Sequence, residues 1–183
     1  CQNISYIDLR SEKEYGKGTI PNAINIPILK NNEYKSVGKE YKINGKAAAI
    51  KLGHNLVSGK IKKERIKAWC DFIYKNPKTK IFCHRGGMRS KIALEWINES
   101  KTITSAISGG YKRFRTLTLE IVQLKNISRK NWIIIGGYTG SGKTNFITPY
   151  NSMIDLESLA NHRGSAFGKK LTNQPTAANF ENS

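Results

Sequence analysis

KIFCHRGGMRS, which spans residues 80–90, places a cysteine between a short apolar run and a glycine-rich loop. The spacing of the apolar residues predicts a strand that ends at Cys83 and a helix over residues 90–98. Gly86 and Gly87 allow the loop to curl without Cβ clashes. Its backbone N–H groups and the positive end of the helix dipole are expected to converge on the sulfur, to favour its thiolate form and to hold an oxyanion.

Two arginines of this loop, Arg85 and Arg89, add permanent positive charge beside the predicted nucleophile. A lone cysteine is more often a buried, unreactive side chain, but the strand, loop and helix around Cys83 favour the reactive interpretation. Cys70 lies on the apolar face of a predicted helix, where a core role fits better, and Cys1 has no informative context. Three scattered cysteines are too few for a disulfide framework or a zinc site.

Strands and helices alternate through residues 1–125, which we predict to form one domain. The predicted strands are 5–9, 20–27, 80–83 and 102–107, with a loop over 10–18, and the predicted helices are 39–57, 60–74, 90–98 and 111–125. Gly45 and Gly53 weaken the first of these helices. The alternation predicts an α/β fold, a parallel sheet with helices on both faces.

WIIIGGYTGSGKT, residues 132–144, opens a second predicted domain over residues 126–183. It satisfies the phosphate-loop pattern G-x-x-x-x-G-K-[ST], and residues 132–135 are expected to form the buried strand that leads into such a loop. The loop amides would wrap a di- or triphosphate, the lysine would bridge its oxygens and the threonine hydroxyl could ligate Mg²⁺. The predicted phosphate-binding residues of this loop are Gly137, Gly140, Gly142, Lys143 and Thr144, in addition to Gly86 and Gly87 of the cysteine loop. This part is therefore predicted to be the first part of a P-loop NTPase-like α/β domain.

An apolar run at residues 153–157 predicts a further strand, with Asp155 as a candidate metal or substrate contact. Asp155 would serve equally well as the N-cap of a helix. Residues 161–165 could bind an anion or form an ordinary loop.

The formal net charge of +18 makes polyanions the expected partners, although a general Lys-rich bias would produce the same number. The basic helix over residues 111–125 offers Lys112, Arg113 and Arg115 as candidates for contact with an RNA backbone. No signal peptide and no membrane span can be read from the sequence, so we expect a cytoplasmic protein.

The N-terminal part resembles the rhodanese domains. The resemblance rests on Asp8-Leu9-Arg10, Glu14, Gly18 and the segment 20–25, and Cys83 stands where those domains carry sulfur on a cysteine. It implies a rhodanese-like fold with Cys83 as the carrier of sulfur or selenium. The spacing Cys-x5-Arg-Ser is also similar to the phosphate loop of cysteine-based phosphatases, although Phe82 stands where tyrosine phosphatases have a histidine.

The two halves together resemble the tRNA 2-selenouridine synthase family. The matching segments are 8–10, 38–42, 48–50, 52–54, 56–59, 83–90, 109–112, 136–144 and 154–165. Members of that family continue through most of the P-loop domain, and an initial strand precedes the Asp-x-Arg segment. The resemblance therefore leads us to expect a truncated chain.

The resemblance implies a transferase that replaces the sulfur of wobble 2-thiouridine in tRNA by selenium from selenophosphate, which a selenophosphate-producing enzyme would supply. The family also geranylates that sulfur with geranyl diphosphate. Cys83 would become S-selanylcysteine, Arg85 and Arg89 would stabilise the departing phosphate, and residues 137–144 would hold the geranyl donor's diphosphate or, alternatively, a nucleotide. A cysteine phosphatase, a P-loop kinase or other NTPase, and a non-catalytic RNA-binding module are the alternatives.

Overall fold

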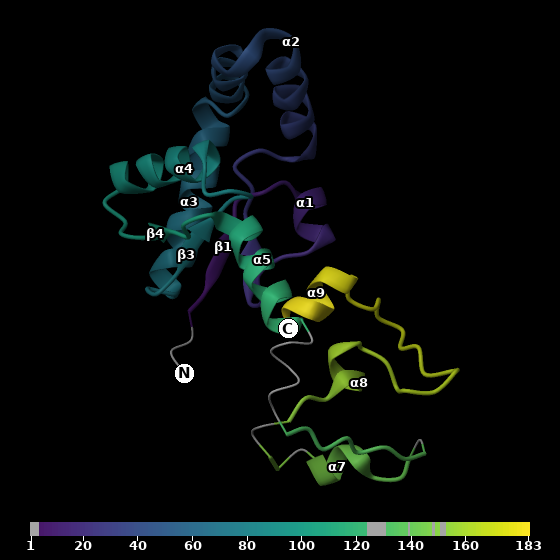
Figure 1. The fold of residues 1–183 in the computed structure, drawn as a ribbon. Helices are drawn as coiled ribbons and strands as arrows, with labels where there is room; N and C mark the ends of the chain where they lie inside the picture. Colours follow the sequence, from purple (N-terminus) through teal and green to yellow (C-terminus); the bar gives the residue numbers. More distant parts are fainter. Residues whose placement is uncertain (1–3, 124–130, 139, 148, 151–152) are drawn as a thin grey trace. The chain divides into compact units, whose positions relative to one another are not determined.

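The computed structural model describes residues 4–123, 131–138, 140–147, 149–150 and 153–183 (Figure 1). The chain divides into two compact units, Cys1–Leu117 and Thr118–Ser183. The predicted domain boundary at residues 125 and 126 lies outside the described residues. None of the described helices is long and apolar enough to cross a membrane.

A four-stranded parallel sheet forms the centre of the first unit. Its strands are β1 (Tyr6–Asp8), β2 (Ala23–Asn25), β3 (Lys80–Phe82) and β4 (Ser105–Ala106), in the order β2-β1-β3-β4. β1 pairs with β2 on one side and with β3 on the other, and β3 pairs with β4. The parallel α/β architecture predicted from the sequence is confirmed.

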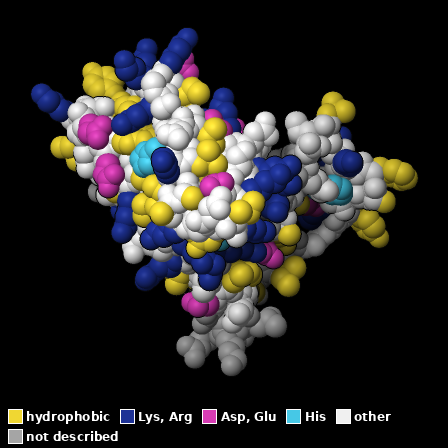
Figure 2. Space-filling model, turned by 90° about the horizontal axis from the view of Figure 1, so that it is seen from above, with side chains coloured by type: hydrophobic (Ala, Val, Ile, Leu, Met, Phe, Trp, Pro, Cys, Tyr) yellow, Lys and Arg dark blue, Asp and Glu magenta, His cyan; other side chains and the backbone are white. Residues whose placement is uncertain are grey.

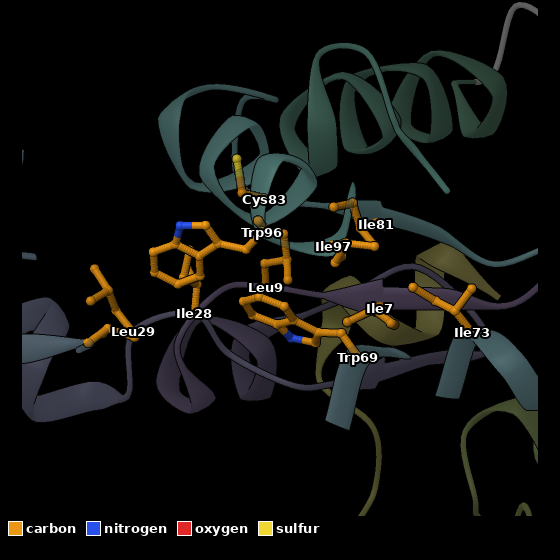
Figure 3. Packing of buried hydrophobic residues seen from close by; sticks show 12 residues of the cluster. Ile7, Leu9, Ile28, Leu29, Trp69, Ile73, Ile81, Cys83, Trp96 and Ile97 are labelled. Carbon is orange, nitrogen blue, oxygen red and sulfur yellow. The ribbon is translucent and has the colours of Figure 1, made fainter. Parts of the chain in front are cut away.

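Helices cover both faces of this sheet. The helices are α1 (Glu12–Lys17), α2 (Asn31–Leu56), α3 (Gly59–Lys75), α4 (Met88–Glu99) and α5 (Gly110–Val122). Adjacent strand residues point to opposite faces, and Ile81 and Phe82, both fully buried, belong to different apolar clusters. The Ile81 cluster contains Trp69 of α3 and Trp96 of α4 (Figure 3). The Phe82 cluster is completed by side chains of α5.

The loop predicted over residues 10–18 contains a helix instead, because local capping favours it. Ser11 is the N-cap of α1: its hydroxyl accepts from the Glu14 N–H, and the Glu14 carboxylate accepts from the Ser11 N–H. This reciprocal pair satisfies two donors at the helix start. Gly18, with φ of 154°, ends the helix.

The helix predicted over residues 39–57 begins earlier and is broken in the middle. α2 starts at Asn31 and turns sharply at Gly45, whose φ of 79° and ψ of −172° are not helical. Glycine adopts such a positive φ without a Cβ clash. The result is a helical hairpin, whose two arms lie beside each other in Figure 1.

The second unit contains the short helices α7 (Lys143–Ile147), α8 (Leu156–Leu159) and α9 (Ala177–Asn182). The buried strand predicted over residues 132–135 is wrong: the segment forms no strand, and Ile133 and Ile134 are 89% and 92% exposed. A strand needs neighbours that complete its backbone hydrogen bonds, and all four strands of the described sheet belong to the first unit. The strand predicted over residues 153–157 is likewise replaced by the start of α8.

Candidate active site

The cysteine loop lies at the carboxyl ends of β1 and β3. In the order β2-β1-β3-β4, the chain passes from β1 to one side of the sheet and later returns on the other side. Ligands of open parallel sheets bind at such a switch point, outside the carboxyl ends of the strands. Cys83 follows β3 directly, and Asp8 ends β1. The topology therefore places the cysteine where this class of fold binds its ligands.

Cys83 is buried beneath the loop and is 3% exposed. It is on the same side of β3 as Ile81 and belongs to the apolar cluster that includes Leu9 and Trp96. In Figure 3 its sulfur points away from the labelled apolar side chains beneath it. The sulfur is thus at the border between the core and the loop rather than within the core.

The loop presents unpaired hydrogen-bond donors around this position. Among the described residues, no acceptor is found for the backbone N–H groups of residues 85–89. Met88 and Arg89 begin α4, so their N–H groups belong to the helix end that carries positive partial charge. The hydroxyl of Ser90 is also buried and has no partner in the described part of the chain. Such an array of donors suits an oxyanion.

Arg89 is fixed next to the loop by Glu14, the residue that also caps α1. The two guanidinium nitrogens Nη1 and Nη2 of Arg89 donate to the carboxylate oxygens Oε2 and Oε1 of Glu14 at 2.6 and 3.0 Å. Burial disfavours the charge of both groups, but their mutual hydrogen bonds and attraction outweigh it. The pKa of Glu14 is therefore lowered and that of Arg89 is raised, an effect to which a Cys83 thiolate also contributes. Arg89 thus stays charged within electrostatic reach of the sulfur.

Arg10 adds a second, fully enclosed guanidinium. Its Nη2 donates to Asp8 at 2.6 Å and to the Gly18 carbonyl at 2.7 Å, and its guanidinium carbon is 3.9 Å from the centre of the Tyr111 ring. The Asp8 carboxylate also accepts from the Thr19 hydroxyl. This network connects the end of β1 to the start of α5, the helix that contacts the cysteine loop.

The pKa of His84 is affected by the positive charges around the loop. Burial lowers the pKa of His84, Glu14 opposes that effect, and the charges of Arg10, Arg89 and Arg85 lower the pKa further. Arg85 itself is exposed. The two loop arginines predicted from the sequence therefore both act on the loop, Arg89 from a fixed position and Arg85 from the solvent side.

The start of α5 supports the loop from the opposite side, a contact that the sequence did not predict. The N–H groups of Tyr111 and Lys112 donate to the carbonyls of Cys83 and His84 at 3.0 and 2.8 Å. Gly110 approaches so closely that a Cβ there would lie 2.2 Å from the Cys83 carbonyl oxygen. The adjacent glycines in the sequence indicated a turn, but not that the turn packs on the cysteine loop.

The helix α5 also carries the predicted RNA-binding residues. The Lys112 and Arg113 residues are exposed, and Arg115 is partly exposed. The Arg113 side chain lies over Gly109, where an added Cβ would meet its Cβ at 2.6 Å. All three basic residues are thus on the helix whose first residues contact the cysteine loop.

Glu14→Gln should weaken the attachment of Arg89 and remove an acid-sensitive part of the folding free energy. Because the folded pKa of Glu14 is lowered, its carboxylate stabilises the fold above the ordinary pKa of 4.5. That stabilisation is lost as the pH falls below this value and through the folded pKa. We expect Glu14→Gln to cost about 2 kcal/mol at pH 7 and progressively less in acid.

Chemical denaturation at a series of pH values between 7 and 3 would measure this difference. The matched control is Glu95→Gln, which neutralises an exposed carboxylate on α4. A constant difference between Glu14→Gln and the parent across this range would contradict the assigned ion pair.

The second unit contains a polar pocket of about 270 Å³ at the predicted phosphate loop. Gly140, Gly142, Lys143 and Thr144 line it, together with Glu157 and Arg163. The Lys143 ammonium donates to the carbonyl oxygens of Gly137 and Tyr138 at 2.7 and 3.0 Å. Gly140 and Gly142 have φ of 83° and 82°, as a tightly curled loop requires. Four of the five residues predicted to bind phosphate in this loop thus line one pocket, and Gly137 lies next to it through its contact with Lys143. Arg163 joins them from a later loop.

Asp155 has a structural partner. Its carboxylate oxygen accepts from the Ser158 N–H at 3.0 Å, so it is the N-cap of α8. The part of the chain that the structure describes contains no group of three or more His, Cys, Asp or Glu side chains that could hold a metal ion.

Comparison with known proteins connects both units to described families. Residues 1–117 match the family model of the rhodanese-like domain, and residues 130–183 match that of the tRNA 2-selenouridine synthase AAA domain. A solved N-terminal domain of a proposed ATP/GTP binding protein from Clostridium difficile 630 is 37% identical. The alignment has a TM-score of 0.59 and covers 65% of this chain and 92% of that one.

Two curated relatives, both named tRNA 2-selenouridine synthase, extend the similarity along nearly the whole chain. The protein from Sulfurovum sp. (strain NBC37-1) is 47% identical over 98% of this chain and 49% of its own length. The protein from Shewanella denitrificans is 47% identical over 96% of this chain and 48% of its own length. The chain spans about half the length of the curated relatives it matches. With a rhodanese-like domain followed by the matching AAA segment, the chain belongs to the tRNA 2-selenouridine synthase family.

Proposed function

We propose that this chain forms the selenium-accepting half of a tRNA-modifying transferase of the cytoplasm. In this proposal the enzyme replaces the sulfur of wobble 2-thiouridine in tRNA by selenium, and selenophosphate is the selenium donor. A geranyl group from geranyl diphosphate is attached to the 2-thio sulfur beforehand, which makes that sulfur a better leaving group. The names of the relatives support the tRNA-modifying activity.

The arrangement around Cys83 is the observation that carries the proposal. Cys83 is followed by a loop whose amides have no acceptor among the described residues, and the charged Arg89 is held in place by Glu14. The amides of residues 85–89 and the Arg89 guanidinium can hold the oxygens of selenophosphate. Arg85 would add its charge from the solvent side. The selenium of the bound donor would then face the sulfur.

The transfer step conserves atoms and electrons. The Cys83 thiolate attacks the selenium of selenophosphate, an S–Se bond forms, and the Se–P bond breaks. The electron pair of the Se–P bond departs with phosphorus, which leaves as phosphite. Phosphorus is thereby reduced by two electrons, which balances the oxidation of sulfur and selenium to the level of a persulfide, and the loop amides and Arg89 stabilise the charge of the phosphite. Cys83 becomes S-selanylcysteine, whose terminal selenium attacks C2 of the geranylated 2-thiouridine and expels geranyl thiolate. A second thiol then attacks the Cys83 sulfur, the S–Se bond breaks, the tRNA leaves with its selenium, and Cys83 is left in a disulfide with that thiol. A selenophosphate-producing enzyme would supply the donor.

Intact-protein mass spectrometry after mixing the chain with selenophosphate tests this proposal. The expected result is an adduct of one selenium atom on the folded protein. A folded protein that acquires no selenium, but hydrolyses a generic aryl phosphate, would instead support the cysteine phosphatase alternative.

The polar pocket of the second unit is our proposed site for the diphosphate of geranyl diphosphate. Lys143 and Arg163 supply positive charge there, and the curled glycine loop supplies amides. Thr144 and Glu157 present oxygen donors in the same pocket, the ligand type that Mg²⁺ prefers. A bound Mg²⁺ would neutralise part of the diphosphate charge. A nucleotide in this pocket is the alternative.

Lys143→Ala should weaken the binding of geranyl diphosphate by about 10- to 100-fold, because a charge-assisted contact to the diphosphate is lost. Isothermal titration of the chain with geranyl diphosphate in the presence of Mg²⁺ would measure this change. Lys169→Ala removes an exposed lysine of the same unit outside the pocket and is the control. Equal affinities of Lys143→Ala and the parent would contradict the assignment, and tighter binding of ATP than of geranyl diphosphate would favour the nucleotide alternative.

The tRNA is the proposed macromolecular partner. Figure 2 shows Lys and Arg side chains spread over the visible face, with fewer Asp and Glu among them. Lys112, Arg113 and Arg115 are the proposed backbone contacts, because α5 begins at the cysteine loop. Phosphates bound along this helix would bring a neighbouring nucleotide towards Cys83.

A further inference from the structure

An apolar pocket of about 410 Å³ lies beside the cysteine loop, between the α2 hairpin and α4. Its size falls in the range of about 300–1,000 Å³ typical of small-molecule sites. Its walls are almost entirely aliphatic or aromatic. Ile28 and Leu29 precede the hairpin, Val37 and Ile50 come from its two arms, and Ile92 and Trp96 come from α4.

Small residues on the second arm of α2 keep the pocket open. Ala49 and Gly53 are four residues apart and therefore share one face of that arm, and both line the pocket. A Cβ added to Gly53 would be 3.8 Å from the Cγ2 of Val37, an ordinary contact between the two arms. The hairpin is thus packed at this point, and the space between it and α4 exists because these positions carry almost no side chain.

The pocket shares residues with the cysteine loop. Met88 and Arg89, the first residues of α4, line it. Arg89 is also held by Glu14, interacts electrostatically with Cys83 and has its guanidinium carbon 5.0 Å from the centre of the Tyr34 ring on α2. A substrate that reacts at Cys83 and contacts Arg89 would therefore contact a residue that also lines this apolar pocket.

The charged side chains that line the pocket indicate the charge of the molecule that binds there. Lys46 and Arg89 are cationic, and no acidic side chain is among the described residues that line it. An apolar group attached to a polyanion fits both properties, since the aliphatic walls bury the chain and the cations accept the anion outside. A free diphosphate without a chain would leave the apolar walls in contact with water.

We propose that this pocket holds the isoprenoid chain on the 2-thio sulfur of a prenylated thiouridine while selenium is transferred at Cys83. The inference rests on the proposed function, which supplies the prenylated substrate. It assigns the isoprenoid group to the rhodanese-like unit during the selenium step. The diphosphate of geranyl diphosphate is assigned to a different pocket, which belongs to the second unit. Burial of the isoprenoid group would orient the bond between the sulfur and C2 of the base, which must break, towards the cysteine loop.

The test is the binding of two nucleosides to the whole chain, S-geranyl-2-thiouridine and S-methyl-2-thiouridine, measured by equilibrium dialysis. We expect the geranyl compound to bind at least ten-fold more tightly. Gly53→Leu fills the pocket and should remove that preference. Gly38→Leu makes the same change at an exposed position on the other arm, where an added Cβ meets nothing, and should leave the preference intact.

Selenium loading of Cys83 separates this inference from the proposed function. Gly53→Leu should load selenium like the parent, because Gly53 does not touch the loop. If Cys83 acquires selenium but both nucleosides bind equally, the pocket assignment is overturned while the function stands. If the geranyl preference is present but no selenium is acquired, the pocket stands and the function fails.

Two further outcomes are decisive. If Gly53→Leu fails to fold, as circular dichroism would show, Ile50→Gln places a polar group in the same wall and should reduce the preference. If geranyl diphosphate binds to the parent and this binding is lost in Gly53→Leu, whereas the geranyl nucleoside does not bind, the occupant of the pocket is the free donor and the proposal is wrong.

Discussion

Cys83→Ser should abolish the transfer of selenium from selenophosphate to the protein. Serine preserves the size and the surroundings of the side chain, so the loop amides and Arg89 remain in place. Its hydroxyl is a far weaker nucleophile than a thiolate and forms no S–Se bond. Intact-protein mass spectrometry should therefore find an adduct of one selenium on the parent and none on the variant.

Cys70→Ser is the matched control, because Cys70 is a second free cysteine of the same unit and packs against the apolar core from α3. This variant should load selenium to the same extent as the parent. Selenium on Cys83→Ser at the parental level would place the acceptor at another thiol. In that case no reacting sulfur would lie next to Arg89 and the loop amides, and their proposed role in stabilising the phosphorus oxyanion would also be wrong.

Gly110→Ala should destabilise the first unit by about 3 kcal/mol or more, one of the largest effects expected of a single methyl group. The new Cβ would lie 2.2 Å from the Cys83 carbonyl oxygen and 2.7 Å from the Gly86 nitrogen. The φ of 57° at this position adds backbone strain for any residue other than glycine. Relief would require α5 to move away from the cysteine loop, breaking the hydrogen bonds of Tyr111 and Lys112.

Thermal denaturation should show a fall in Tm of roughly 10 °C or more for Gly110→Ala. Selenium loading should fall with it even at temperatures where the variant remains folded, because the loop loses its support. The control is Gly38→Ala, where the added Cβ meets nothing and φ is ordinary, so stability should be unchanged or slightly higher. A Gly110→Ala protein with parental Tm and loading would contradict the close packing of α5 on the cysteine loop.

The local elements near the cysteine could be read from the sequence because each depends on neighbouring residues. The apolar run before Cys83 predicted β3, and the period of apolar residues predicted α3 and α4, which the structure contains with small shifts at their ends. The phosphate-loop residues were also recognisable, because a curled anion-binding loop requires glycines at set positions. The strand predicted before that loop failed, since a strand depends on partners elsewhere in the chain.

Short stretches of the sequence are sufficient to specify the parallel α/β architecture, the cysteine at the end of a strand and the glycine loop ahead of a helix. The folded arrangement was needed to show that Glu14 holds Arg89, 75 residues away, that Gly110 packs on the Cys83 carbonyl, and that α2 folds back at Gly45 to leave an apolar pocket. The period of the apolar residues and the positions of the glycines can be read within a short segment of sequence. The contacts above join segments that are far apart along the chain, and the sequence does not show that such segments are close in space.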